Sequence, residues 1–185
     1  MSHSQFPSID YIRQCLRYED GKLFWLRRPL EHFTTHRTWK SWNVKHSGKE
    51  AGGIGPGGGG SWKPYFTWRL RINGISYHRS NIVWLIHNGE WKSWIDHKDR
   101  NSLNDQIGNL RLSTPSQNCA NSTLYSNNTS KYKGVDWHKK SSKWRSRIQV
   151  RSRSILLGYF DDPAKAHETY VAAANEHFGE FACKG

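Results

Sequence analysis

The chain has 185 residues, which gives room for one large domain or two small ones, and its hydrophobic content of 35% is too low for a membrane protein. No apolar stretch approaches bilayer-spanning length, and the start "MSHSQFPSIDYIRQ" lacks the layout of a secretion signal. These features predict a soluble, intracellular protein without a membrane partner. Lys and Arg number 28 against 15 Asp and Glu, and the resulting net charge of +13 favours polyanionic partners.

The three cysteines, Cys15, Cys119 and Cys183, lie far apart in the chain, and no C-x-x-C motif occurs. This spacing argues against a zinc knuckle, and an odd count argues against a disulfide framework. Any metal is therefore expected to be a hard cation held by oxygen and imidazole.

The N-terminal third predicts short elements. "SIDYIRQCLRYE" predicts a helix capped by Ser8, and "LFWLRR" is strand-like. Residues 30–50 are basic and aromatic without a clear period, so no element is assigned there. "AGGIGPGGGG" lacks the Gly-Lys-Ser/Thr ending of a phosphate-binding loop, and its composition predicts a flexible loop.

"YFTWRLRINGISYH" predicts a β-hairpin with Asn73-Gly74 as its two-residue turn. Its apolar residues alternate with basic ones, so one face is apolar and the other carries Arg69 and Arg71. "RSNIVWLIHNG" then predicts a helix that ends at Gly89.

Residues 94–118, "WIDHKDRNSLNDQIGNLRLSTPSQN", predict a strand, a polar loop, a second strand and the start of a helix. Thr114 is the expected N-cap, with Pro115 in the first helical position and Gln117 completing a capping box. Such a β-β-α unit would bring Asp96, His97 and Asn118 together. A plain surface loop is the competing interpretation.

Those residue types suit the hydrolysis of a phosphodiester. Asp96 and the Asn118 amide supply oxygen ligands for a hard cation and leave positions for phosphate and water. His97 can take the proton from an attacking water near neutral pH. Because adjacent strand residues point to opposite faces, Asp96 and His97 converge only where the strand ends or kinks.

The segment "IDHKDRNSLNDQIGNLRLSTPSQN" resembles the motif of HNH nucleases, in the variety found in phage and intron-encoded homing endonucleases. The matching residues are Asp96, His97, Asn109 and Asn118. The resemblance implies that Asp96 and Asn118 bind one divalent metal, with Mg²⁺ as the expected ion and Mn²⁺ as the alternative. It also implies that His97 is the general base, and that Asn109 holds the loop so that His97 is oriented. Upstream, "YHRSNIVWLIHNGEW" resembles the lead into this motif, where His78 is expected to start a helix or pack rather than bind metal.

After a polar linker, three strand-like pieces lead into the helical "DPAKAHETYVAAANEHFG", with Asp162 as its N-cap. We expect Ala166, Tyr170, Ala173 and His177 to form the inward stripe of that helix. On the second strand the residues alternate between an apolar face and a polar one, and the polar face is formed by Lys143, Arg145, Arg147 and Gln149.

This C-terminal stretch resembles the plant Apetala-two, ethylene-response-factor type of DNA-binding domain, through "KGV", "KWRSRI" and "LGYFDDPAKAH". The resemblance implies a three-stranded antiparallel sheet that lies in the major groove and is backed by a helix. Asp136, Ser154 and Leu156 depart from the plant pattern, so the plant target sequence does not carry over. Arginine and glutamine on a sheet face also suit the reading of guanine and adenine.

The sequence therefore predicts an α+β protein divided into four parts: a β-rich N-terminal region (1–75), a β-β-α HNH nuclease core (76–122), a linker (123–130) and a DNA-binding domain (131–185). The predicted function is a site-specific homing endonuclease acting on double-stranded DNA in the cytoplasm of a bacterial host, with no obligate protein partner. A non-cleaving DNA-binding regulator is the alternative, and an RNA-binding protein is a third. The expected DNA contacts are Lys133, His138, Lys143, Arg145, Arg147, Gln149, Arg69 and Arg71.

Overall fold

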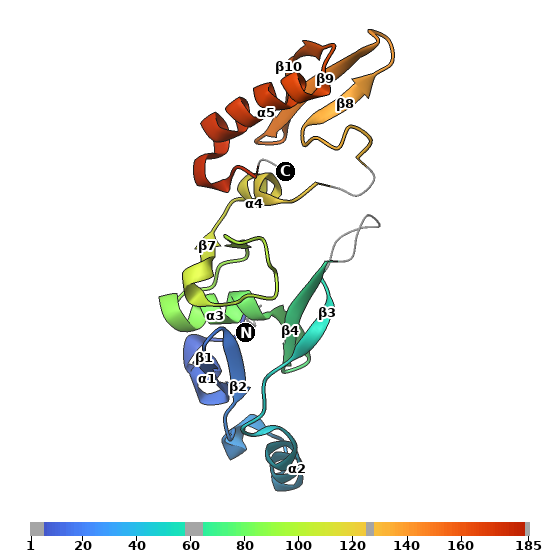
Figure 1. Ribbon diagram of the computed structural model, residues 1–185. Coiled ribbons are helices and arrows are strands. Elements are labelled where there is room, and N and C mark those ends of the chain that lie inside the picture. The colour runs from blue at the N-terminus through green and yellow to red at the C-terminus, as the bar shows by residue number, and fades with distance from the viewer. Residues whose placement is uncertain (1–5, 58–64, 125–127, 184–185) are drawn as a thin grey trace. The chain divides into compact units, whose positions relative to one another are not determined.

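A computed structural model describes residues 6–57, 65–124 and 128–183 (Figure 1). The chain forms two compact units, residues 1–112 and 113–185, and each has its own hydrophobic core. The division lies earlier in the chain than the end expected for the nuclease core at residue 122. None of the described helices is long and apolar enough to cross a membrane.

The N-terminal unit alternates short helices with small antiparallel sheets, as expected for an α+β protein. β1 pairs with β2, β4 pairs with both β3 and β5, and β6 pairs with β7. Its elements are α1 (Ile9–Cys15), β1 (Leu16–Glu19), β2 (Lys22–Trp25), α2 (His36–His46), β3 (Gly53–Pro56), β4 (Phe66–Ile72), β5 (Ile75–His78), α3 (Arg79–Asn88), β6 (Ile95–His97) and β7 (Leu110–Leu112), with short 3₁₀ turns at Leu30–His32 and Ile107–Asn109.

The local signals at three boundaries act as predicted. Ser8 caps α1, its hydroxyl accepting a hydrogen bond from the Tyr11 N–H at 3.2 Å. Asn73 and Gly74 join β4 to β5 with φ of 49° and 83°, the left-handed pair that a two-residue hairpin turn requires. α3 ends at Gly89, also left-handed, whose N–H bonds to the Leu85 carbonyl at 2.9 Å.

Two stretches differ from expectation. Residues 30–50, to which no element was assigned, contain α2, whose N-cap Thr35 accepts from the Thr38 N–H at 3.1 Å. The expectation of a flexible loop over residues 51–60 is wrong for β3, which pairs with β4; residues 58–60 lie outside the described residues. Glycine is needed beside this strand, because a Cβ on Gly52 would lie 2.3 Å from the Arg69 carbonyl oxygen.

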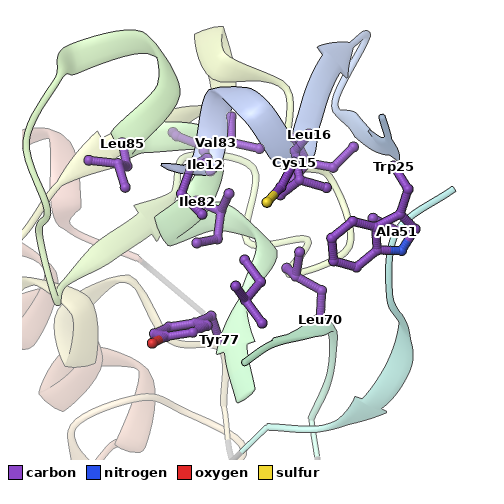
Figure 2. Packing of buried hydrophobic residues seen from close by; sticks show 13 residues of the cluster. Ile12, Cys15, Leu16, Trp25, Ala51, Leu70, Tyr77, Ile82, Val83 and Leu85 are labelled. Atoms are coloured by element: carbon purple, nitrogen blue, oxygen red, sulfur yellow. The ribbon is translucent and has the colours of Figure 1, made fainter. Parts of the chain in front are cut away.

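The core of the N-terminal unit lies between α1, α3 and the strands around them. Ile12 on α1 lies beside Ile82 and Val83 on α3, and all three are fully buried (Figure 2). Leu70 of β4 and Leu23 of β2 belong to the same cluster. This packing fixes α3 and β4, which lead into the segment that carries the candidate site.

The C-terminal unit contains α4 (Pro115–Asn121), a three-stranded antiparallel sheet and α5 (Pro163–Phe178). The sheet order is β10 (Arg153–Phe160), β9 (Lys143–Val150) and β8 (Val135–His138), and α5 packs against it (Figure 1). This architecture confirms the predicted sheet backed by one helix. Asp162 caps α5 as predicted, its carboxylate accepting from the Ala164 N–H at 2.8 Å.

The inward stripe of α5 was predicted wrongly at its C-terminal end. Ala166 and Tyr170 are buried as expected and Ala173 is half-buried against the same core, but the buried stripe continues through Ala174 and Phe178, and His177 is exposed. The buried positions follow a spacing of four residues, and the large Phe178 side chain gains more from burial than an imidazole does.

Candidate active site

The predicted strand, loop and strand are present as β6, residues 98–109 and β7. His97 ends β6 opposite Leu110 of β7, and Asp96 lies opposite Arg111. The predicted helix follows as α4, with its capping box formed. The Thr114 hydroxyl accepts from the Gln117 N–H at 3.2 Å, and the Gln117 side chain accepts from the Thr114 N–H at 2.8 Å.

The loop between the strands is organised around the carboxylate of Asp99. Asn104 and Asn109 donate side-chain N–H groups to it at 2.7 and 2.9 Å, and the Asn101 backbone N–H donates at 2.8 Å. The Asn109 side chain also donates to the Asn104 carbonyl at 2.8 Å and accepts from the Asp99 N–H at 3.0 Å. The asparagines of this loop therefore supply hydrogen bonds that regular secondary structure would otherwise provide. They satisfy backbone groups of the loop and the charge of Asp99.

These contacts shift the titration of Asp99. Burial raises the pKa of the Asp99 carboxyl, but hydrogen bonds from Asn104, Asn101 and Asn109, together with nearby His97, outweigh burial. The pKa of Asp99 is therefore lowered from its usual 3.8. A depressed pKa in the folded state means that the ionised Asp99 stabilises the loop above the unfolded pKa, and that this contribution is lost as the pH falls through the folded value.

We accordingly expect the hydrogen-exchange protection of amides in residues 99–109 to fall as the pH is lowered from about 5 to about 2. Amides of α3 provide the internal reference. Asp99→Asn should remove most of the pH dependence of the loop while leaving that of α3 unchanged. Loop protection that stays constant relative to α3 across this range would contradict the assignment.

His97 is held by a residue that the sequence did not single out. Its Nε2 lies 2.8 Å from Oδ1 of Asp105, whose side chain is fully buried. The Arg79 Nε donates to the other oxygen of Asp105 at 2.7 Å, and the Arg79 side chain is only 3% exposed. His97, Asp105 and Arg79 thus form a continuous chain of polar side chains, in which Asp105 and Arg79 are buried and His97 is half-buried.

Arg79 is itself fixed from three sides. Its Nη1 donates to Glu50 at 2.9 Å, its Nη2 donates to the Leu103 carbonyl at 3.4 Å, and its guanidinium lies 4.1 Å from the ring centroid of Trp68. A partial signal was present in the sequence, because Arg79 directly follows His78 in the stretch "YHRSNIVWLIHNGEW" that resembles the lead into the motif. The partnership with Asp105, 26 residues away, had no local signal.

His78 serves as the N-cap residue of α3, which agrees with its expected structural place. Burial lowers the pKa of His78, and the Arg69 guanidinium and His97 lower it further, while Asp105 opposes them. Arg69, expected to contact DNA, lies with its Nη1 3.3 Å from His78 Nε2 and donates to the Ser76 hydroxyl at 3.1 Å. Arg71, the second expected contact, is exposed.

The two expected metal ligands lie in different units. Asp96 is 5% exposed, and its Oδ2 accepts from Arg111 Nε at 2.8 Å. Asn118 lies in the first turn of α4, where its N–H donates to the Thr114 carbonyl at 2.9 Å. One carboxylate and one amide are suitable donors for a hard cation. Within residues 6–57, 65–124 and 128–183, no group of three or more His, Cys, Asp or Glu side chains could hold a metal ion.

The expected DNA-binding residues of the C-terminal unit divide into two groups. Lys143, Arg145, Arg147 and Gln149 alternate along β9 with the buried Ser146 and Ile148, as predicted. Asp136 of β8 pairs with Arg145 at 2.7 Å and with Arg147 at 3.1 Å. Lys143 pairs with Asp161 at 3.1 Å.

The other two expected DNA-binding residues of this unit, His138 and Lys133, form hydrogen bonds with nearby groups of the chain. His138 Nδ1 lies 2.8 Å from the Ser141 hydroxyl at the turn after β8. The Lys133 ammonium donates to the carbonyls of Ala120 and Ser122, both at 2.5 Å. Lys133 therefore satisfies carbonyl groups at the C-terminal end of α4 and ties that helix to the rest of the C-terminal unit.

Comparisons with known proteins match the same segment of the chain. Residues 77–120 match the family model described as HNH endonuclease, and this range contains Asp96, His97, Asn109 and Asn118. Protein 3.8 of Escherichia phage T7 is 39% identical over 83 residues, which cover 40% of this chain and 69% of the phage protein. An uncharacterized HNH endonuclease of Acanthamoeba polyphaga mimivirus is 35% identical over 130 residues, covering 63% of this chain and 65% of its own length. No solved structure matches. The chain belongs to the HNH endonuclease family, whose members are phosphodiester hydrolases.

Proposed function

We propose that the protein is a site-specific DNA endonuclease of the homing type, acting in the cytoplasm of a bacterial host. The observation that carries this proposal is the setting of His97. It ends β6 beside Asp96, it is anchored by a buried carboxylate, and it is followed by a loop that Asn109 ties together. An imidazole held in this way suits proton transfer better than a histidine on an ordinary surface loop.

In the proposed reaction, His97 removes a proton from a water molecule as the water oxygen bonds to phosphorus. The bond from phosphorus to the 3′ oxygen breaks, and the departing oxygen takes a proton from solvent water, which leaves a 5′ phosphate and a 3′ hydroxyl. Asp96 and Asn118 would hold one divalent cation, Mg²⁺ or Mn²⁺, which stabilises charge on the phosphoryl and departing oxygens. Asn109 positions His97 through its hydrogen bonds within the loop.

We assign the choice of target to the polar face of the C-terminal sheet, as in the Apetala-two type of domain. In support, β9 presents Arg145, Arg147 and Gln149 on the face opposite α5, and the strand alternation keeps them in a row. A row of this kind fits the edges of bases in a major groove. Arg69 and Arg71 of β4, with Lys133, His138 and Lys143, are proposed as further DNA contacts that set register.

Arg147→Ala tests this assignment. If Arg147 reads a base, the variant should lose about 1–3 kcal/mol of binding free energy at the preferred site and tolerate substitutions at one base pair. Competition binding on a panel of singly substituted sites measures both effects. Arg151→Ala, at an exposed turn, is the matched control for loss of one positive charge. An equal loss on every sequence, with a reduced salt slope, would instead mark a phosphate contact.

The test of the proposed activity is to incubate phage genomic DNA with the protein and Mg²⁺ and to sequence the new ends, with chelator in the parallel sample. Discrete ends that appear only with metal establish the endonuclease, reveal its site and show whether one strand or both are cut. Sequence-selective DNA retention without any ends would favour the alternative, a non-cleaving regulator. Retention of RNA over DNA would contradict both.

A further inference from the structure

The chain of side chains that ends at His97 specifies more than the position of the ring. We infer that Asp105 is a positioning residue that fixes His97 in the tautomer with hydrogen on Nε2, so that Nδ1 is the atom that accepts the proton from water. This inference rests on the proposed role of His97 as the general base. It adds to that role both the residue that orients the base and the nitrogen that acts.

The hydrogen-bonding capacities of the three groups require this tautomer. Arg79 has only N–H donors, so its Nε–H donates to Oδ2 of Asp105 at 2.7 Å. The carboxylate can only accept, so its Oδ1, 2.8 Å from His97 Nε2, must receive a hydrogen from that nitrogen. In the neutral ring the second nitrogen, Nδ1, is then left with a lone pair.

The surroundings hold this arrangement in place. The Asp105 side chain is fully buried, and turning His97 away would leave Oδ1 without its donor, at a cost of about 1–3 kcal/mol for an unsatisfied buried group. Arg79 cannot retreat, because Glu50 and the Trp68 ring confine its guanidinium. The ring therefore has one favoured orientation and one favoured tautomer.

The same contact assists proton transfer. When Nδ1 takes a proton, the ring gains a positive charge 2.8 Å from the Asp105 carboxylate, which stabilises it. Hydrolases with a histidine base and a buried carboxylate use this arrangement in the same way. Asp105 touches neither water nor DNA in this scheme, so its effect reaches the reaction through His97.

Asp105→Asn is expected to reverse the tautomer of His97. The Arg79 Nε–H still needs an acceptor, so the single carbonyl oxygen of asparagine faces Arg79 and the amide NH₂ faces His97. An NH₂ group can only donate, so His97 Nε2 must become the acceptor and the hydrogen must move to Nδ1. The substitution should thus change the tautomer and remove the lone pair from Nδ1 without removing the imidazole.

The measurement is the ¹⁵N spectrum of the histidine-labelled 185-residue chain, with the His97 signals identified by their absence in His97→Gln. We expect the Nε2–H form in the wild type and the Nδ1–H form in Asp105→Asn. On DNA, kcat should fall on the order of 10²-fold while KM is unchanged. Glu50→Gln, which takes a carboxylate from the same arginine but not from His97, should keep the wild-type tautomer.

The two readouts separate the inference from the proposed function. An Nδ1–H wild type, or a variant that changes tautomer without loss of kcat, would overturn the inference. The wild-type spectrum is decisive even where the variant folds poorly. If the tautomers behave as expected but the wild-type protein cuts no DNA, positioning by Asp105 is supported and the nuclease proposal is refuted.

Discussion

His97→Ala is expected to reduce DNA cleavage by on the order of 10²- to 10⁴-fold, the usual contribution of a positioned general base. Its affinity for the target should remain close to that of the wild type, since the base acts only in the chemical step. Single-turnover cleavage with saturating enzyme measures the first quantity, and equilibrium binding in chelator measures the second. A drop in kcat with unchanged binding is the signature of a residue that works in the transition state.

His177→Ala provides the matched control, because it removes an exposed histidine on α5 that contacts none of the candidate site residues in the described structure. It should cut like the wild type. If His97→Ala cleaves at the control rate, the proposed mechanism is wrong and the base must be sought elsewhere. If it loses binding as well, the loop has lost its structure, which thermal unfolding would reveal.

Arg79→Leu is expected to lower the free energy of unfolding of the N-terminal unit by about 3–5 kcal/mol. The reason is that Asp105, whose side chain is fully buried, would lose the cation that compensates its charge. Leucine can fill part of the space but cannot donate to a carboxylate. Urea unfolding followed by the tryptophan fluorescence of this unit measures the loss.

Arg17→Leu is the comparison that isolates burial as the cause. Arg17 pairs with Glu19 at 2.6 Å, a distance as short as that of the buried pair, but both side chains are more than half exposed. Exposed pairs contribute at most about 1 kcal/mol, so this variant should unfold close to the wild type. Similar losses in both variants would show that the Arg79 pair contributes no more than a surface pair.

Where elements are encoded by adjacent residues, the sequence predicts them well. Asn73-Gly74 specifies a hairpin turn, Thr114 to Gln117 specify a capping box, and Asp162 before Pro163 specifies the start of α5. Each signal acts within four residues, and tertiary contacts add only the packing. The same holds for the row of polar residues on β9, which follows from strand alternation alone.

Elements that depend on distant partners were not predicted. β3 is a strand because it pairs with β4, and the glycine-rich sequence of β3 contains no pattern that predicts this pairing. α2 is polar in composition and its buried residue is Asn43, so no run of core-forming residues revealed it in the sequence. Asp105 looks like one more polar loop residue until Arg79 and His97 are placed around it. The motif residues could be identified from their resemblance to a known motif, but the contact of His97 with Asp105 could not be foreseen.

The single carboxylate of Asp136, shared by two arginines of β9, has a consequence for selectivity. Any anion that approaches Arg145 or Arg147 must compete with a partner that is already in place and tethered. Polyanions that bind nonspecifically therefore encounter less available positive charge than the net charge of +13 implies. A ligand able to offer acceptors to both guanidiniums at once is penalised least. Such a surface favours selective binding of a few ligand sites over nonspecific binding of any polyanion.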